Sequence, residues 1–292
     1  MRAAGQLHRS QPAITRRIKL LEDHLGAPLL ERGRNGATLT EAGRTFLPYA
    51  EAVLAALKDG TQAVHGLQGS DHGAVSLAIV GTLAGTTIVE QLRRFSARHR
   101  KARLELRTAN SFEVSDMVRR GEVNLGLRYF ADPSPELISR RISEERIAVV
   151  CSAQHEWGGK RLRDPGQLRA DQWLSLPMTR HHDSFAYLVA RQLASAGLDD
   201  VPVMTIDSMT AQKRLIEAGI GIALLPESSI HEELRLGTLR TINVSHLQTT
   251  VPIHLLYRKN GYLTGASRTL LTLISNVPLR RSSPAHRNRK RK

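Results

Sequence analysis

One stretch near the start of the chain, residues 7–26 (LHRSQPAITRRIKLLEDHLG), limits the fold more than any other. Ser10 can cap a helix start because its side-chain oxygen can accept from a free backbone N–H. Pro12 is tolerated in the first turn, where the missing N–H would have no partner, and Gly26 is a natural stop. An apolar stripe runs between them, formed by Ile14, Ile18, Leu21 and Leu25. The stretch therefore predicts an amphipathic helix.

The remaining faces of this helix are polar and basic. They consist of Gln11, Thr15 and Lys19, flanked by Arg16 and Arg17. Residues 1–21 hold five Arg or Lys and no acid, and residues 2–8 predict a short preceding helix. Gln and Arg near a helix N-terminus are residue types that bond base edges in the major groove. The pair favours a helix-turn-helix that reads DNA, although periodicity alone equally fits a solvated surface helix.

A small β-wing is expected next. Short extended pieces at residues 28–30 and 37–39 enclose the segment Arg32-Gly33-Arg34-Asn35-Gly36, in which Asn-Gly favours a tight turn. Its tip would offer Arg32 and Arg34 to the DNA backbone. An ordinary basic surface turn is the alternative interpretation.

A long helix is predicted from Thr40, as its cap, to about residue 66. Its apolar seam alternates between spacings of four and three and consists of Phe46, Ala50, Val53, Leu57, Gly60, Val64 and Leu67. Such alternation is typical of a coiled coil, with Pro48 expected to bend the helix near its start. We therefore expect a homodimer through this helix. The alternative is that the seam packs on the chain's own C-terminal domain.

In the remainder, strands are expected at 74–80, 104–109, 124–129 and 146–151, with a helix over 82–100 between the first two. Strands that alternate with helices predict an α/β fold with a parallel sheet. Two similar α/β lobes would fit, the second inserted before the chain returns to the first. The expected domains are a winged helix-turn-helix over 1–40, a linker and dimerisation helix over 41–67 and an effector-binding domain over 73–278. The second lobe would span roughly 145–245. A basic tail over 279–292 is too polar to pack and is expected to be disordered.

The N-terminal residues resemble the DNA-binding region of LysR-type transcriptional regulators. The shared features run from Ala3-Ala4 and Leu7-His8 through Ser10-Gln11-Pro12-Ala13 to Leu39-Thr40-Glu41-Ala42-Gly43, at consecutive spacing. Residues 207–226 also resemble a late helix of that family followed by Gly-x-Gly and a strand ending in Leu-Pro. The resemblance implies a winged helix-turn-helix, a linker helix and two α/β lobes like those of a periplasmic binding protein.

One departure from the family pattern concerns the first residues. Members of the family normally begin with another helix before the Ala-Ala pair, whereas here Met1 directly precedes Arg2-Ala3-Ala4. Without that helix the apolar sides of Leu7, Ile14 and Ile18 would be exposed. We expect either that the chain starts too late, through a misplaced start or a truncation, or that it binds DNA poorly.

Individual residues of the predicted helix-turn-helix and wing have expected contacts with DNA. Gln11 and Thr15 are expected to reach base edges, while Ser10, Arg16 and Arg17 bond phosphates. Pro12 and Ala13 would meet thymine methyl groups. Arg32 and Arg34 would hold the backbone or the minor groove from the wing.

A cleft between the lobes is the expected sensing site, because small ligands bind at the carboxyl ends of strands. The candidate residues follow predicted strands and are Thr82, Ser111, Arg128, Tyr129, Arg180 and Ser208. Helix N-termini at Thr82 and Ser208 suit an anion, and Arg128 or Arg180 could add a bidentate clamp. The resemblance implies a small effector, with a carboxylate as one candidate. Capping and surface ion pairs are the structural alternatives at each position.

Composition restricts the class of protein further. The formal charge of +15 suggests a polyanionic partner, although the tail supplies seven of the basic residues and the remaining 35 basic and 27 acidic residues leave +8. Cys151 is the single cysteine, which excludes an intrachain disulfide and favours a reducing cytoplasm. No run is long and apolar enough for a membrane span.

Enzyme motifs are absent from the sequence. It contains no P-loop and no Gly-x-Ser-x-Gly elbow, and His181-His182-Asp183 lacks further metal ligands at a useful spacing. We therefore expect a regulator without catalytic residues, metal or cofactor. Its expected partners are double-stranded DNA, a small effector, further copies in a homodimer or homotetramer, and RNA polymerase. The alternatives are a small-molecule binding protein whose DNA binding is impaired by the short N-terminus, and an architectural DNA binder driven by the basic tail.

Overall fold

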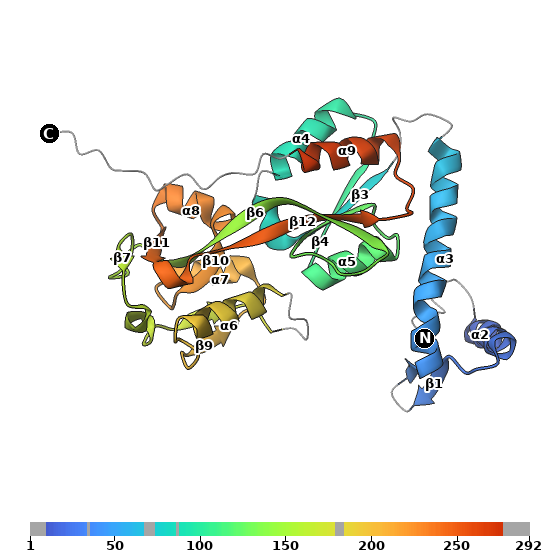
Figure 1. Ribbon diagram of the computed structural model, residues 1–292, viewed down its shortest axis with the longest axis horizontal. Coiled ribbons are helices and arrows are strands. Elements are labelled where there is room, and N and C mark those ends of the chain that lie inside the picture. The colour runs from blue at the N-terminus through green and yellow to red at the C-terminus, as the bar shows by residue number, and fades with distance from the viewer. Residues whose placement is uncertain (1–9, 34–35, 67–73, 86–87, 179–183, 277–292) are drawn as a thin grey trace. The chain divides into compact units, whose positions relative to one another are not determined.

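The computed structural model describes residues 10–33, 36–66, 74–85, 88–178 and 184–276 (Figure 1). Contacts divide the chain into two compact units, Met1–Leu57 and Lys58–Lys292. The predicted helix at 2–8, Arg34, Arg180, His181-His182-Asp183 and the tail at 279–292 lie outside the described residues. No helix in the described part is long and apolar enough to cross a membrane.

Helix α2 (Gln11–Leu25) opens the first unit and has the predicted ends. Ser10 occupies the N-cap position in extended conformation, but its side chain makes no capping hydrogen bond. A cap normally bonds the second or third N–H of the helix, and the second residue here is Pro12, which has none. Gly26 ends the helix at φ 70°, in the left-handed region that favours glycine.

The apolar stripe of α2 is not buried among the described residues. No residue of the helix is buried, and Leu21 and Leu25 are 39% and 40% exposed. Ile14 and Ile18, whose apolar sides we expected to be exposed, are half-buried.

The wing is a two-stranded antiparallel sheet of β1 (Leu30–Gly33) and β2 (Gly36–Leu39), with Leu30 opposite Leu39. Helix α3 (Glu41–Gly66) follows, with Pro48 inside it. Thr40 Oγ1 accepts from Gly43 N at 2.9 Å, as predicted for its cap. The seam residues Val53, Leu57 and Val64 are all at least 60% exposed.

The first lobe of the second unit is built on a mixed sheet. Strand β3 (Val75–Val80) lies between β4 (Leu104–Ala109) and β5 (Leu125–Tyr129), parallel to both. Strand β12 (Thr249–Arg258) is antiparallel to β5 and to β6 (Leu137–Ser152). The prediction of a parallel sheet is thus wrong for β12, which runs antiparallel to both of its neighbours because the chain returns from the second lobe in the opposite direction.

Helices cover both faces of this lobe. Helices α4 (Ile88–Arg98) and α9 (Gly265–Ser275) lie together on one face, and α5 (Ser111–Arg119) packs on the other (Figure 1). The predicted helix over 82–100 is instead the 3-10 turn η1 (Gly81–Gly85) followed by α4.

The second lobe uses the far half of β6. Strand β6 pairs there with β10 (Ala223–Pro226) and β11 (Leu239–Val244). The remaining elements are β7 (Arg161–Leu162), β8 (Trp173–Ser175), β9 (Val203–Thr205), α6 (Phe185–Ser195), α7 (Met209–Glu217), α8 (His231–Leu236), η2 (Pro165–Leu168), η3 (Glu227–Ile230) and η4 (Ser245–Leu247). The short strand predicted at 146–151 is therefore the end of a 16-residue strand that belongs to both lobes.

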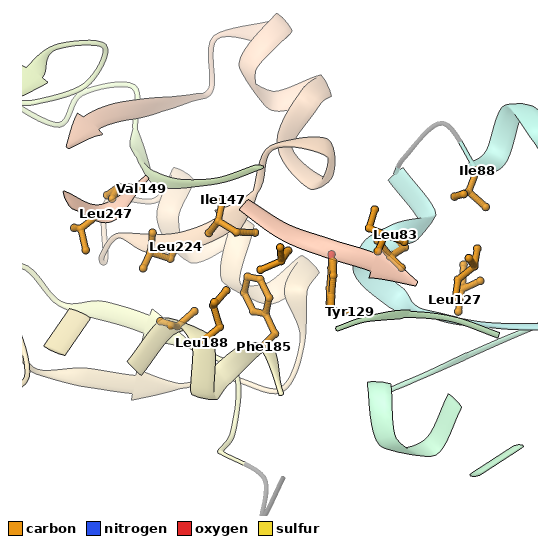
Figure 2. Close-up of a cluster of buried hydrophobic side chains, with 14 of the residues drawn as sticks. Leu83, Ile88, Leu127, Tyr129, Ile147, Val149, Phe185, Leu188, Leu224 and Leu247 are labelled. Atoms are coloured by element: carbon orange, nitrogen blue, oxygen red, sulfur yellow. The ribbon is translucent and has the colours of Figure 1, made fainter. Parts of the chain in front are cut away.

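One buried apolar cluster extends through both lobes. Figure 2 shows Leu83, Ile88 and Leu127 of the first lobe on one side of Tyr129, and Phe185, Leu188, Leu224 and Leu247 of the second lobe on the other side. Strands β6 and β12 connect the two sets of side chains. The two lobes therefore share a core as well as a sheet.

Candidate DNA-reading face and effector cavity

A groove of about 880 Å³ lies between helix α2 and the wing in the first unit. Gln11, Thr15 and Lys19 line its helix side, and Gly33, Gly36 and Ala37 line its wing side. The structure thus brings two of the predicted base-reading residues, Gln11 and Thr15, to one groove with the wing strands.

The other predicted DNA residues lie around this groove rather than in it. Ser10, Pro12, Arg16 and Arg17 are exposed on α2 and Ala13 is half-buried. Arg32 belongs to β1, opposite Ala37. The exposed side chains of Arg16 and Arg17 are free to approach a phosphate backbone.

Local hydrogen bonds fix the angle between α2 and the wing. Glu22 Oε1 accepts from Leu29 N at 2.7 Å and from Leu30 N at 3.0 Å. Thr40 Oγ1 donates to Pro28 O at 2.6 Å, and Thr40 N donates to Leu29 O at 3.0 Å. A Cβ on Gly43 would lie 2.1 Å from Leu29 O, so only glycine allows α3 to start this close. The sequence alone indicated no role for Glu22 or Gly43. In the structure Glu22 accepts hydrogen bonds from the backbone before and at the start of β1, and Gly43 allows the close approach of α3 to Leu29.

A cavity of about 410 Å³ lies in the second unit, at the carboxyl ends of β3, β4 and β5. Three of the predicted effector residues line it: Thr82, Ser111 and Tyr129. The rest of its described wall consists of Val80, Gly81, Ala109, Asn110, Phe112, Leu176, Pro177, Ser184, Phe185, Ala186, Asp207 and Met209. The cavity therefore draws on both lobes and is mainly apolar with a few hydroxyl groups, as ligand sites commonly are.

Three α-helices start at this cavity. Helix α5 begins with a capping box, in which Asn110 Oδ1 accepts from Glu113 N and Glu113 Oε2 accepts from Asn110 N, both at 3.0 Å. Ser184 caps α6 and Ser208 caps α7 through their hydroxyl groups. Ser208 itself does not line the cavity, although its neighbours Asp207 and Met209 do. Helix N-termini carry partial positive charge and favour an anionic ligand.

Tyr129 organises the first-lobe wall. Its hydroxyl lies 2.7 Å from Thr82 Oγ1, and its ring centroid lies 5.9 Å from that of Phe185 (Figure 2). Burial raises the pKa of Tyr129 above its usual value, so the phenol stays protonated. Ser111 is 7% exposed and its hydroxyl has no hydrogen-bond partner among the described residues, which leaves it available to a ligand.

Arg128 was predicted to bind the effector, but it does not line the cavity. Its Nη1 donates to Asp132 Oδ2 and to Ser115 Oγ, both at 2.7 Å, and its Nε donates to Tyr129 O at 3.0 Å. Successive side chains of a strand point to opposite faces, so Arg128 and Tyr129 cannot both face the cavity. Burial lowers the pKa of Arg128, and Asp132 opposes that shift. The described lining contains no Lys or Arg, and Asp207 is its one charged residue.

Residues 68–277 match the family described as the LysR substrate binding domain, and residues 1–44 match the bacterial regulatory helix-turn-helix proteins of the lysR family. The chain belongs to the LysR family. It is a LysR-type DNA-binding transcriptional regulator with an effector-binding domain.

Several relatives of this LysR-family chain are transcriptional regulators by name. TfdS of Cupriavidus pinatubonensis is 28% identical over 257 residues, covering 87% of this chain and 85% of TfdS. CitR of Bacillus subtilis is 25% identical over 235 residues, covering 80% and 79% of the two chains.

Solved structures of LysR regulators share this architecture. Full-length CbnR in complex with its target DNA is 26% identical, with a TM-score of 0.61 over 93% of this chain and 92% of CbnR. Full-length OxyR C199D of Pseudomonas aeruginosa shares the fold at 19% identity, with a TM-score of 0.69 over 94% and 88%.

Proposed function

We propose that this regulator reads promoter DNA with the groove face of α2. Gln11 and Thr15 contact base edges, Pro12 and Ala13 meet thymine methyl groups, and Ser10, Arg16 and Arg17 bond phosphates. Arg32 and Arg34 add backbone or minor-groove contacts from the wing. The groove that joins Gln11 and Thr15 to the wing carries this proposal.

The proposed effector is a small anion with an apolar body. Its negative group would meet the N-termini of α5, α6 and α7, and the hydroxyl groups of Thr82, Ser111 and Tyr129 would bond it. Ser208 would act through its cap of α7, and Arg180 is the proposed cationic clamp. Its apolar part would contact the aromatic and aliphatic walls. Binding would favour one angle between the lobes and so change the affinity for DNA.

We also propose that the regulator works as a homodimer or homotetramer. The exposed seam of Val53, Leu57 and Val64 on α3 supports pairing with a second copy, because large apolar side chains gain free energy when they leave water. RNA polymerase is the further partner that a promoter-bound regulator would meet, and the bacterial cytoplasm is the proposed location. We propose no catalytic role, in keeping with the membership of the chain in a family of transcriptional regulators.

Selection of genomic fragments by the purified full chain tests the DNA proposal. We expect enrichment of a limited set of promoter fragments over scrambled competitor. Enrichment should persist in a chain that lacks residues 279–292 and disappear in a chain that lacks residues 1–40. Equal retention of all fragments would instead indicate a general polyanion binder. Loss of binding on removal of residues 279–292 alone would indicate the same.

Thermal unfolding with a panel of small carboxylates and phosphate esters tests the effector proposal. A ligand of the cavity present at about 100 times its Kd should stabilise the protein by about 2.7 kcal/mol. The Ser111→Ala chain should respond less, whereas Ser195→Ala, on an exposed face of α6, should respond as the native chain does. An anion that stabilises all three chains equally would not be acting at the cavity.

A further inference from the structure

The last turns of α3 belong to the second unit and are held there by a largely buried ion pair. Asp59 Oδ1 accepts from Arg258 Nη2 at 2.6 Å, and Asp59 Oδ2 accepts from Tyr262 N at 3.1 Å. The side chains of Arg258 and Asp59 are only 14% and 12% exposed. Exposed pairs contribute little to stability, whereas breaking a buried pair leaves an uncompensated charge out of water.

The preceding residue of α3 makes a second contact with the first lobe. Lys58 Nζ donates to Gly121 O at 2.6 Å and to Glu122 O at 3.3 Å. Both acceptors lie in the turn between α5 and β5. Two adjacent residues of one helix therefore hold two separate parts of the lobe, which fixes the helix against rotation as well as translation.

These contacts lie at the edge of the sheet opposite the effector cavity. The cavity lies where β3, β4 and β5 end, whereas Gly121 and Glu122 precede the start of β5. Arg258 is the last residue of β12, five residues beyond Ile253, which pairs with the cavity residue Tyr129. At about 3.4 Å per residue, one strand thus connects the two edges over about 17 Å.

The pairing between β12 and β6 contains the irregularity at which the lobes could pivot. Ile253 pairs with Ser143 and His254 with Arg141, so Ile142 is an extra residue that forms a bulge in β6. Residues on one side of that bulge pair with the first lobe, and residues on the other side run toward the second. A bulge locally bends a strand and breaks its pairing. Strand β12 pairs with β6 on both sides of this bulge, so a change of angle between the lobes would shift the pairing of β12 as far as its terminal residue, Arg258.

We propose that Asp59 and Arg258 form a lock, supported by Lys58, that makes the end of α3 a rigid part of the first lobe. The lock passes a change at the cavity directly to the linker helix, and in the same way passes a change at the DNA back to the cavity. Asp59 and Arg258 are thus positioning residues for the regulatory response. This inference rests on the proposed effector cavity but requires no knowledge of the effector.

Hydrogen exchange of the full chain, followed by mass spectrometry, tests the lock itself. In Arg258→Met, peptides covering residues 58–64 should exchange about tenfold faster, while β3 and α9 stay protected. Arg258→Lys keeps the charge and should restore part of the protection. Arg214→Met, which breaks the exposed pair with Glu217, serves as the control and should change nothing in α3. Unchanged exchange at 58–64 in Arg258→Met, or faster exchange throughout the second unit, would overturn the lock.

Adding a promoter fragment selected by the native chain tests the transmission. Coupling between two sites is reciprocal, so DNA should change exchange at the cavity peptides around residues 109–118 by about threefold. That change should vanish in Arg258→Met and persist in Arg258→Lys and Arg214→Met. A DNA effect that is equal in all chains, or absent from the native chain bound to DNA, would overturn the transmission. Failure of the native chain to select any fragment would instead refute the proposed function, and the result at residues 58–64 would still decide whether the lock exists.

Discussion

Helices α2 and α5 are both amphipathic, yet they sit in very different surroundings. Helix α5 buries Ser111, Val114, Ser115 and Val118 against the sheet, whereas α2 buries no residue. Among the described residues of the first unit, only Leu29 and Ala55 are buried apolar side chains. The second unit has a continuous core, while the first depends on a few hydrogen bonds around its wing. Under the DNA-reading role proposed for α2, the helix keeps its surface available at the expense of its own stability.

Truncation of a core leucine gives the largest expected contrast between the units. Leu127 is fully buried, so Leu127→Ala should lower the free energy of unfolding of the second unit by about 2–5 kcal/mol. Leu25→Ala in α2 should lower the stability of the first unit by less than about 1 kcal/mol. Chemical denaturation with a probe in each unit measures both effects. A larger loss from Leu25→Ala would mean that α2 has a packing partner and would break the comparison.

Removal of the acceptor that joins α2 to the wing should have the next largest effect. Glu22→Ala leaves Leu29 N and Leu30 N without their acceptor, and we expect a loss of about 1–3 kcal/mol confined to the first unit. Asp23→Ala, its exposed neighbour, is the matched control. Thermal unfolding of the two variants beside the native chain would show whether hydrogen bonds, rather than a core, hold this unit together.

Substitutions on the α2 surface should change DNA recognition with little change in stability. Gln11→Ala should reduce discrimination between operator and random DNA by about 1–3 kcal/mol. Arg16→Ala should weaken both complexes alike and reduce the salt slope by about 0.9. Fluorescence anisotropy titrations at several salt concentrations measure both quantities. Equal losses on operator and random DNA for Gln11→Ala would remove this residue from base reading.

A pH dependence is expected to be the smallest effect, and it belongs to the second unit. His254 is buried beside Arg128 and Arg141, with Nδ1 3.1 Å from Ser139 Oγ, and burial lowers its pKa below 6.5. The unfolded chain therefore takes up the proton first as the pH falls. Stability should be complete above pH 6.5 and decline below it, as the pH falls toward the folded pKa. His254→Gln should flatten this decline, whereas His246→Gln, at an exposed position, should keep it. Melting temperatures that depend on pH in the same way in the native chain and both variants would contradict the assignment of the decline to His254.

Local signals in the sequence were enough to predict most elements of the first lobe. Alternating or continuous apolar runs identified β3, β4 and β5, and a cap and a stop residue identified the ends of α2. Strand β6 was recognised only at its apolar end, because its first half carries Arg140, Arg141, Glu144 and Glu145, which pair with β12 at a place no local pattern reveals. Strand β11 was missed, because its pairing with β6 and β7 depends on residues far away in the chain.

The candidate cavity was likewise predictable where local signals placed its residues, and unpredictable where it depends on the assembled lobes. Thr82, Ser111 and Tyr129 were predicted from their position after strands, and that position brings them together. Arg128 was predicted on the same ground, but the alternation of side chains turns it toward Asp132. Phe185 of the second lobe was missed, since an apolar residue at a helix start gives no signal of a ligand until the lobes are assembled.

The return of β12 to the first lobe has a genetic consequence. This strand lies between β5 and β6, so a premature stop codon after Val244 would remove an interior strand from the lobe that was synthesised first. Nonsense mutations and frameshifts late in the reading frame should therefore abolish the whole sensing unit, not merely trim it. A fragment of the first lobe alone would have to be made by excising the second lobe and rejoining β6 to β12.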